Sequence, residues 1–135
     1  MPLVMLIDDN EIDLFLNKKF LEVAHISNNV ISFSHAEKAL QYLTQQKDNL
    51  YELPDIILLD IQMPEMNGFE FLEKFNAFSD KVKRKTSVIM LSSTIDPIDI
   101  KRAKDYSFLI DILTKPLNPP VLKEILKKEL KLNAA

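Results

Sequence analysis

The sequence predicts an α/β fold: a doubly wound (βα)5 domain in which a five-stranded parallel sheet carries helices on both faces. Short apolar runs without polar alternation, typical of strands buried on both faces, recur along the 135 residues. Segments with apolar residues at spacings of three and four, typical of helices, alternate with these runs. For five such units the common strand order is 2-1-3-4-5, with a switch point between the first and third strands.

The first predicted strand, Leu3–Ile7, ends in two adjacent acids, Asp8 and Asp9. A helix follows, with Asp9 or Asn10 as its cap. Helix capping explains one acid, but two adjacent acids after a buried strand are more than one cap requires. We expect Asn17-Lys18-Lys19 on the solvent side of this helix. The apolar positions expected to face the core are Ile12, Phe15, Leu16, Phe20 and Val23.

The second strand is expected at residues 30–33, followed by a helix that Ser34 and Glu37 begin with a capping box. Residues 44–53 read as a polar, irregular connection. The stripe of this helix that is expected to be buried consists of Ala36, Ala39, Leu40 and Leu43.

The third apolar run, residues 54–60, ends in Asp60, at the rim where open α/β sheets place their chemistry. Gly68 is the only glycine of the chain, which indicates a positive φ or a close backbone approach there. The basic residues 79–85 are predicted to form a solvated loop. Between them lies a helix whose core stripe is Phe69, Leu72, Phe75 and Phe78.

The fourth strand, residues 86–91, leads into the hydroxyl cluster Ser92-Ser93-Thr94, which turn formation alone would also explain. Asp96-Pro97 opens the fourth helix. The residues of that helix and its exit that are expected to face inward are Ile100, Ala103 and Tyr106.

The fifth strand is expected within residues 108–113, and Thr114-Lys115-Pro116 follows it. Asn118 is the expected cap of the last helix. Its buried stripe is predicted to consist of Val121, Leu122, Ile125, Leu126 and Leu130.

Composition excludes several classes of function. The absence of cysteine rules out disulfides, thiolate catalysis and Cys-type zinc sites, and a single glycine rules out Gly-rich phosphate loops. A net charge of −3 and a pI near 5.4 argue against direct nucleic-acid binding. No apolar stretch approaches the roughly 20 residues of a membrane-spanning helix, and no signal peptide is evident. We therefore expect one domain, residues 1–135, in the cytoplasm and without membrane contact.

The expected strand order brings the carboxylates of Asp8, Asp9 and Asp60 into one crevice. Three neighbouring carboxylates repel, which raises pKa values or recruits a cation such as Mg²⁺ that prefers oxygen ligands. Asp60 is then a nucleophile able to form an aspartyl phosphate. Ser92 and Lys115, at neighbouring strand ends, would supply a hydrogen bond and a positive charge for the phosphoryl oxygens.

This set of residues resembles the receiver domain of two-component response regulators, which has a flavodoxin-like fold. The likeness spans essentially the whole chain. It implies a phosphorelay regulator in which Asp60 accepts phosphate from a phosphohistidine on a sensor histidine kinase or a histidine phosphotransfer protein. The motifs that carry it are Asp8-Asp9, Asp60 with Met63-Pro64 and Gly68, Ser92-Ser93, and Lys115-Pro116.

The resemblance also implies a role for each site residue. Asp9 and Asp60 would bind Mg²⁺ (or Mn²⁺) directly together with the Gln62 carbonyl, while Asp8 would act mainly through water. Ser92 would hydrogen bond to the phosphoryl group, and Lys115 would pair with it. The Lys115-Pro116 peptide is expected to be cis. Such a protein is not an enzyme but a phosphoacceptor with intrinsic Mg-dependent phosphotransfer and autodephosphorylation chemistry.

The chain departs from the family pattern at several positions. Ile112 stands where the family often has an aromatic switch residue, and Phe108 and Leu109 replace small residues. The face formed by the fourth helix, fifth strand and fifth helix is therefore expected to be more apolar and to favour a homodimer. No output domain is expected after Ala135, so a downstream target protein or dimerisation would read the phosphorylated state, in which Ser92 moves inward and this face repacks.

Three other functions remain open from the residues alone. A phosphatase of the haloacid dehalogenase type would also use Asp60, but it wants a second Asp two residues later, where this chain has Gln62. A flavodoxin-like electron carrier needs a phosphate loop where Asp8 and Asp9 would repel a flavin phosphate. A binding module that is never phosphorylated would not need the full set of acids, hydroxyl and lysine.

Overall fold

The computed structural model describes residues 1–130, and it contains the predicted five-stranded sheet. The strands are β1 (Leu3–Ile7), β2 (Asn29–Phe33), β3 (Ile56–Asp60), β4 (Ser87–Ser92) and β5 (Leu109–Thr114). All neighbouring strands are parallel, in the order β2-β1-β3-β4-β5. The predicted 2-1-3-4-5 order is therefore confirmed, and so is the fold class.

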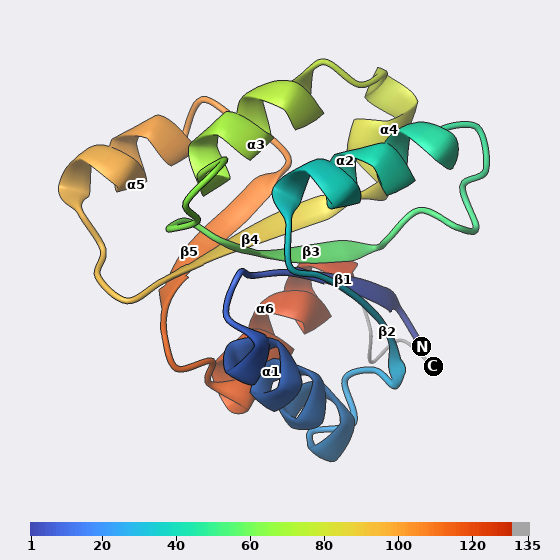
Figure 1. Ribbon diagram of the computed structural model, residues 1–135. Helices are drawn as coiled ribbons and strands as arrows, with labels where there is room; N and C mark the ends of the chain where they lie inside the picture. The colour runs from blue at the N-terminus through green and yellow to red at the C-terminus, as the bar shows by residue number, and fades with distance from the viewer. Residues whose placement is uncertain (131–135) are drawn as a thin grey trace.

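The helices cover both faces of the sheet (Figure 1). They are α1 (Glu11–Val23), α2 (Ala36–Gln45), α3 (Gly68–Asn76), α4 (Asp80–Lys85), α5 (Pro97–Ala103) and α6 (Pro119–Leu130). In Figure 1, α1 and α6 lie on one face, while α2, α3, α4 and α5 lie on the other. The molecule is thus a three-layer sandwich, in which helices lie between successive parallel strands, the arrangement for which right-handed crossovers are expected.

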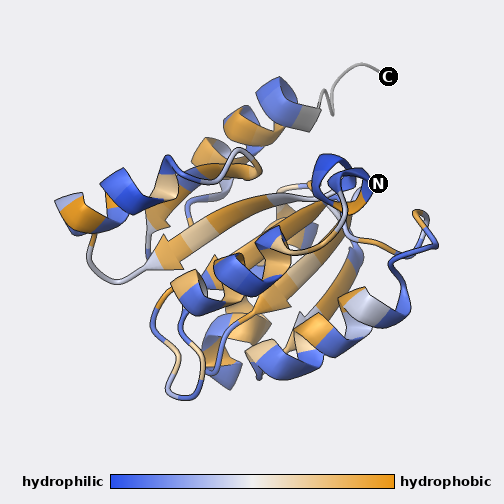
Figure 2. Ribbon diagram, turned by 90° about the horizontal axis from the view of Figure 1, so that it is seen from above, coloured by the Kyte–Doolittle hydropathy of each residue, from blue (hydrophilic) through white to orange (hydrophobic). Residues whose placement is uncertain are grey.

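The core consists of two apolar clusters, one on each face of the sheet. Met5 and Ile57 belong to the cluster under α2 and α3, whereas Leu6 and Leu58 belong to the cluster under α1 and α6. Every residue of β1 and β3 is buried, because successive side chains enter opposite clusters. This explains why the apolar runs show no polar alternation, and Figure 2 shows the hydrophobic sheet between helices of mixed character.

The prediction for the inner face of α1 is wrong in large part. Asn17, which was expected in solvent, is buried, and so is Leu21. The helix is therefore rotated so that its buried face contains a polar residue, and the apolar spacing alone selected the wrong face. Four of the five residues predicted to face the core are exposed: Ile12, Phe15, Leu16 and Val23.

The predicted solvated loop at residues 79–85 is wrong as well, because this segment contains the helix α4. The Ser79 side chain accepts a hydrogen bond from the Val82 N–H and caps the helix. Val82 is buried in the core cluster under α2 and α3 and anchors the turn. A single apolar residue within a basic run gives no periodicity, so the sequence pattern did not reveal this helix.

The helix caps agree with prediction at three positions and disagree at one. The side chains of Asn10, Asp96 and Asn118 each accept a hydrogen bond from a backbone N–H in the first turn of α1, α5 and α6. The capping box expected from Ser34 does not form, because α2 begins after His35, which makes no side-chain cap. The helix therefore starts one residue later than the sequence motif suggests.

Two smaller corrections concern the outer helices. Ile100 of α5 and Val121 of α6 were predicted to face inward, but both residues are 45% exposed. Phe108 is buried, packing edge-on to Phe75 with ring centroids 4.9 Å apart, so it adds nothing to the surface beside β5. The side chain of Leu130 lies outside the described residues.

Within residues 1–130, no helix has the length and apolar character that crossing a bilayer requires.

Candidate functional site

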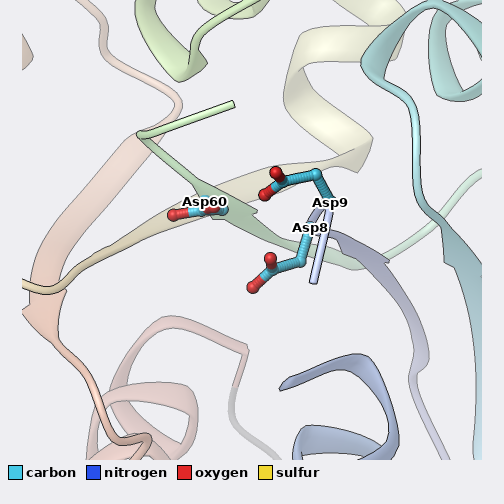
Figure 3. A group of neighbouring side chains, drawn as sticks. All are labelled: Asp8, Asp9 and Asp60. Atoms are coloured by element: carbon cyan, nitrogen blue, oxygen red, sulfur yellow. The ribbon is translucent and has the colours of Figure 1, made fainter. Parts of the chain in front are cut away.

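The candidate site lies at the carboxyl ends of β1 and β3, the two strands on either side of the switch point. Ile7 pairs with Leu59, so the next residues, Asp8 and Asp60, stand opposite each other. The side chains of Asp8, Asp9 and Asp60 each place a carboxylate oxygen within 4.8 Å of the other two. Figure 3 shows the three carboxylates extending from the ends of these strands. The convergence predicted from the strand order is therefore present.

Lys115 reaches this cluster from the residue after β5. Its Nζ donates hydrogen bonds to Asp8 Oδ2 at 2.8 Å and to Asp13 Oδ2 at 2.9 Å. It also forms an ion pair with Asp60 Oδ1 at 3.4 Å. The peptide between Lys115 and Pro116 is cis, as the resemblance implied. The sequence pattern did not reveal the part of Asp13 in this site, because an acid in the first turn of a helix is already favoured by the helix dipole.

Burial and charge perturb both central residues of the site. Burial, reinforced by the neighbouring Asp8 carboxylate, raises the pKa of Asp60 to about 6, although Lys115 acts in the opposite direction. Burial alone would lower the pKa of Lys115, but its hydrogen bonds with Asp8 and Asp13 outweigh this and hold that pKa above its usual value. The site therefore contains an acid that ionises near neutrality beside a permanently charged ammonium.

Gln62 connects the Asp60 loop with the end of β4. Its backbone N–H donates to Asp60 Oδ1 at 3.3 Å, and its side-chain Oε1 accepts a hydrogen bond from Ser93 Oγ at 2.9 Å. The Ile61 N–H donates to the Leu91 carbonyl, which continues the pairing of β3 with β4 beyond Asp60. These bonds fix the backbone on which the Asp60 carboxylate stands.

Ser92 occupies the predicted position at the end of β4, but its hydroxyl is engaged locally. Its Oγ donates to the carbonyl of Thr94 and accepts from the Thr94 N–H at 3.3 Å. The backbone of Ser92 also accepts a hydrogen bond from the Lys115 N–H at 2.7 Å. The ends of β4 and β5 are thereby joined, and a small turn holds the hydroxyl.

Gly68 is required for close packing rather than for a positive φ. It lies at the start of α3 with an ordinary negative φ. A Cβ placed there would lie 2.6 Å from Met90 Cε, 2.9 Å from Ile61 Cα and 3.0 Å from the Asp60 carbonyl oxygen. Of the two predicted explanations, close approach is confirmed and positive φ is wrong. The first turn of α3 therefore rests directly on the backbone of the site.

The donor set is of the kind that a hard divalent cation binds. Asp8, Asp9 and Asp60 supply carboxylate oxygens only, which suits Mg²⁺ better than a metal that prefers nitrogen or sulfur. Lys115 contacts three carboxylates, those of Asp8, Asp13 and Asp60, and the Asp9 carboxylate lies beside two of them, so the described site has an excess of negative charge. Such an arrangement can bind a cation and, with it, an anionic phosphoryl group.

The same combination of fold and site occurs in known proteins. The sequence profile of the response regulator receiver domain matches residues 4–127. The crystal structure of a two-component response regulator from Cytophaga hutchinsonii is similar with a TM-score of 0.86 and 31% identity, over 95% of this chain and 96% of that one. A response regulator receiver protein from Dyadobacter fermentans gives a TM-score of 0.84 and 36% identity, over 94% and 96% of the two chains.

Similar sequences also occur within longer proteins. A two-component response regulator of Oryza sativa subsp. indica is 29% identical over 126 residues, which are 92% of this chain and 53% of that protein. The chain spans about half, or less, of the length of this and three other curated relatives.

Proposed function

Because this chain belongs to the response regulator receiver family, we propose that it is a cytoplasmic phosphoacceptor switch in which Asp60 receives a phosphoryl group from a phosphohistidine. Receiver domains take part in two-component phosphorelays as regulatory phosphoacceptors, with histidine kinases as their partners. The observation that carries the proposal is the meeting of Asp8, Asp9, Asp60 and Lys115 at one point of the sheet.

The transfer itself needs a nucleophile and charge compensation. A carboxylate oxygen of Asp60 attacks phosphorus, the P–N bond of the donor phosphohistidine breaks, and the departing imidazole takes up a proton. With a pKa of about 6, Asp60 is mostly ionised at neutral pH and can act as this nucleophile. The Lys115 ammonium, 3.4 Å from Asp60 Oδ1, is close enough to pair with a phosphoryl oxygen attached there.

A divalent cation completes the proposed site. Asp9, Asp60 and the Gln62 carbonyl would hold Mg²⁺ or Mn²⁺, with Asp8 acting through water. When bound, the cation supplies positive charge to the phosphoryl oxygens. The role of the chain is to hold the carboxylates together, and the buried β1–β3 pairing does so.

Switching would begin at Ser92. To hydrogen bond to a phosphoryl oxygen, its hydroxyl must leave the Thr94 carbonyl, and this opens the small turn that leads to α5. We expect the surface of α5, β5 and α6 to repack as a result, since Asp96, the N-cap of α5, comes only two residues after Thr94.

The proposed output surface is this same face of α5, β5 and α6. Ile98 and Ile100 of α5 are both exposed. Ile100 lines a shallow groove between α5 and β5, together with Ile112 at the usual aromatic position. Its occupant in the phosphorylated state would be a downstream target protein or a second copy of this chain. Movement of Ser92, rather than rotation of an aromatic ring, would alter this surface.

Two alternatives are less compatible with the site. A phosphatase would need an acid two residues after Asp60, but the Gln62 amide cannot transfer a proton and accepts a hydrogen bond from Ser93. A flavin phosphate would meet Asp8 and Asp9, which repel it.

The direct test is covalent modification. Incubation with acetyl phosphate and Mg²⁺ is expected to add one phosphoryl group to the wild-type protein, measured by intact mass spectrometry. Asp60→Asn is expected to abolish the addition, whereas Asp48→Asn, a change at an exposed loop acid, should leave it intact. An unmodified wild-type protein, or full modification of Asp60→Asn, would contradict the proposal.

A further inference from the structure

The ion pair between Lys115 and Asp13 joins the site to α1 and has no part in the mechanism above. The two residues are 102 positions apart in sequence, and their Nζ and Oδ2 atoms lie 2.9 Å apart. The side chains are 20% and 33% exposed, so the pair is partly shielded from water. Asp13 stands in the first turn of α1, where helix geometry and the Asn10 cap fix its backbone.

The distances show how the ammonium is shared. An ammonium group has three N–H donors. Two of them serve Asp8 at 2.8 Å and Asp13 at 2.9 Å, while Asp60 Oδ1 is more distant at 3.4 Å. The positive charge of Lys115, which the phosphoryl group would need, is therefore shared among three carboxylates. Its two shortest contacts are with Asp8 and Asp13 and not with the phosphoacceptor Asp60.

Asp8 and Asp13 differ in what they can do for Lys115. Asp8 is almost fully buried beside Asp60, and it belongs to the proposed cation site. Asp13 lies at the rim, is partly exposed, and is not among the three carboxylates that cluster at the strand ends. It can lose its contact with the ammonium and be solvated instead, which Asp8 cannot do at comparable cost.

We propose that Asp13 is a positioning residue that competes with the phosphorylated Asp60 for the Lys115 ammonium and thereby opposes phosphorylation. This inference rests on the proposed role of Asp60. In the unphosphorylated protein Asp13 holds one N–H of Lys115, and the phosphoryl oxygens must displace it. Displacement also breaks the contact between the first turn of α1 and Lys115, the residue that follows β5. Phosphorylation would therefore alter α1 as well as α5.

The test measures the affinity for beryllofluoride, a non-covalent phosphoryl analogue, in the presence of Mg²⁺. Labelling with ¹⁵N-glycine gives one amide signal, that of Gly68, whose N–H donates to Ile61 next to Asp60. Asp13→Asn keeps the shape of the side chain and removes its charge. Affinity is expected to rise about two- to fivefold, the range for a partly exposed ion pair.

Two controls and a second variant isolate the contact. Glu11→Gln removes an equal charge from the same helical turn, but Glu11 forms no ion pair within residues 1–130. The affinity of this variant for beryllofluoride should therefore match that of the wild type. In a Lys115→Gln background, Asp13→Asn should have no further effect. Asp13→Ser is a second variant with the same expected direction, in case the amide finds a new partner.

Failure of the Asp13 proposal can be distinguished from failure of the proposed function of Asp60. Unchanged or weaker binding by both Asp13 variants would overturn the proposal, as would an equal effect of Glu11→Gln or an effect that persists without Lys115. A wild-type protein that neither binds beryllofluoride nor becomes phosphorylated would instead refute the proposed function of Asp60.

Discussion

Replacing Gly68 with alanine is expected to destabilise the protein, although alanine favours helices. The added Cβ would lie 2.6 Å from Met90 Cε, 2.9 Å from Ile61 Cα and 3.0 Å from the Asp60 carbonyl oxygen. The methionine end can move, but the other two atoms are backbone of the loop that carries the site. Something in that loop must therefore shift.

The magnitude follows from two opposing effects. Overpacking a tight site costs about 1–3 kcal/mol. Alanine in place of glycine regains about 0.5–1 kcal/mol of backbone entropy and helix propensity. The difference between these ranges is about 0–2.5 kcal/mol. Two of the three close contacts are with backbone atoms, which cannot move aside as a side chain can, so we expect a net loss of about 1–2 kcal/mol. This corresponds to a decrease in Tm of about 3–8 °C for a domain of this size. Because the displaced atoms belong to Asp60 and Ile61, phosphorylation by acetyl phosphate should also become slower.

Thermal and urea unfolding of Gly68→Ala and wild type measure this difference. Lys74→Ala, at an exposed position of the same helix, is the matched control and should stay within about 0.5 kcal/mol of wild type. Met90→Leu removes Cε while keeping the core filled, so combining it with Gly68→Ala should restore only part of the loss. A Gly68→Ala protein as stable as wild type would refute the packing argument.

The remaining predictions concern charge, a buried hydroxyl and helix orientation. Since folding raises the pKa of Asp60 to about 6, its charge opposes folding above that pH, and the penalty is relieved as pH falls from about 6 to below 4. In EDTA, Asp60→Asn should therefore be about 1–3 kcal/mol more stable than wild type at pH 8, as measured by urea unfolding. This difference in the free energy of unfolding should disappear near pH 4, and a difference independent of pH would contradict the prediction. Tyr106→Phe removes the hydrogen bond to Glu73 and should cost about 0.5–1.5 kcal/mol in the same assay, whereas no loss would mean that the bond is not formed in solution. Phe15→Ser should change stability by less than about 0.5 kcal/mol, and Leu21→Ala should lose about 2–5 kcal/mol; the reverse ranking would restore the orientation of α1 that the sequence suggested.

The sheet was predictable because its signal is strong and local. β1 and β3 are buried on both faces, and only an uninterrupted apolar run satisfies that environment. The strand order followed from general rules for parallel sheets, and with it the meeting of Asp8 and Asp60. The site was therefore accessible from sequence to the extent that it depends on strand ends.

The helices were less predictable, because a helix can bury either of two faces. In α1 the apolar residues Ile12 and Phe15 give a regular stripe, yet the side that packs on the sheet contains Asn17 and Leu21. Hydrophobic spacing reports where a stripe lies, not which stripe meets the core. In α4 the short length and one apolar residue left no pattern to find.

Asp13 was missed for a different reason. Its contact with Lys115 depends on how the start of α1 lies relative to the end of β5, and residues 102 apart in sequence give no local sign of it. An acid in the first turn of a helix is ordinary, because it interacts with the helix dipole. Only the three-dimensional arrangement distinguishes that common function from an ion pair at the site.

The long separation between the acids and their counter-charge has a consequence for protein synthesis. Asp8 and Lys115 lie 107 residues apart, so a ribosome has translated most of the domain before the lysine exists. A nascent chain that ends before this point carries Asp8, Asp9 and Asp60 without their ammonium, and their repulsion opposes closure of the sheet edge. A nascent chain that lacks Lys115 would therefore be a poor phosphoacceptor, and competence for the proposed phosphorylation would arise only after Lys115 has been synthesised.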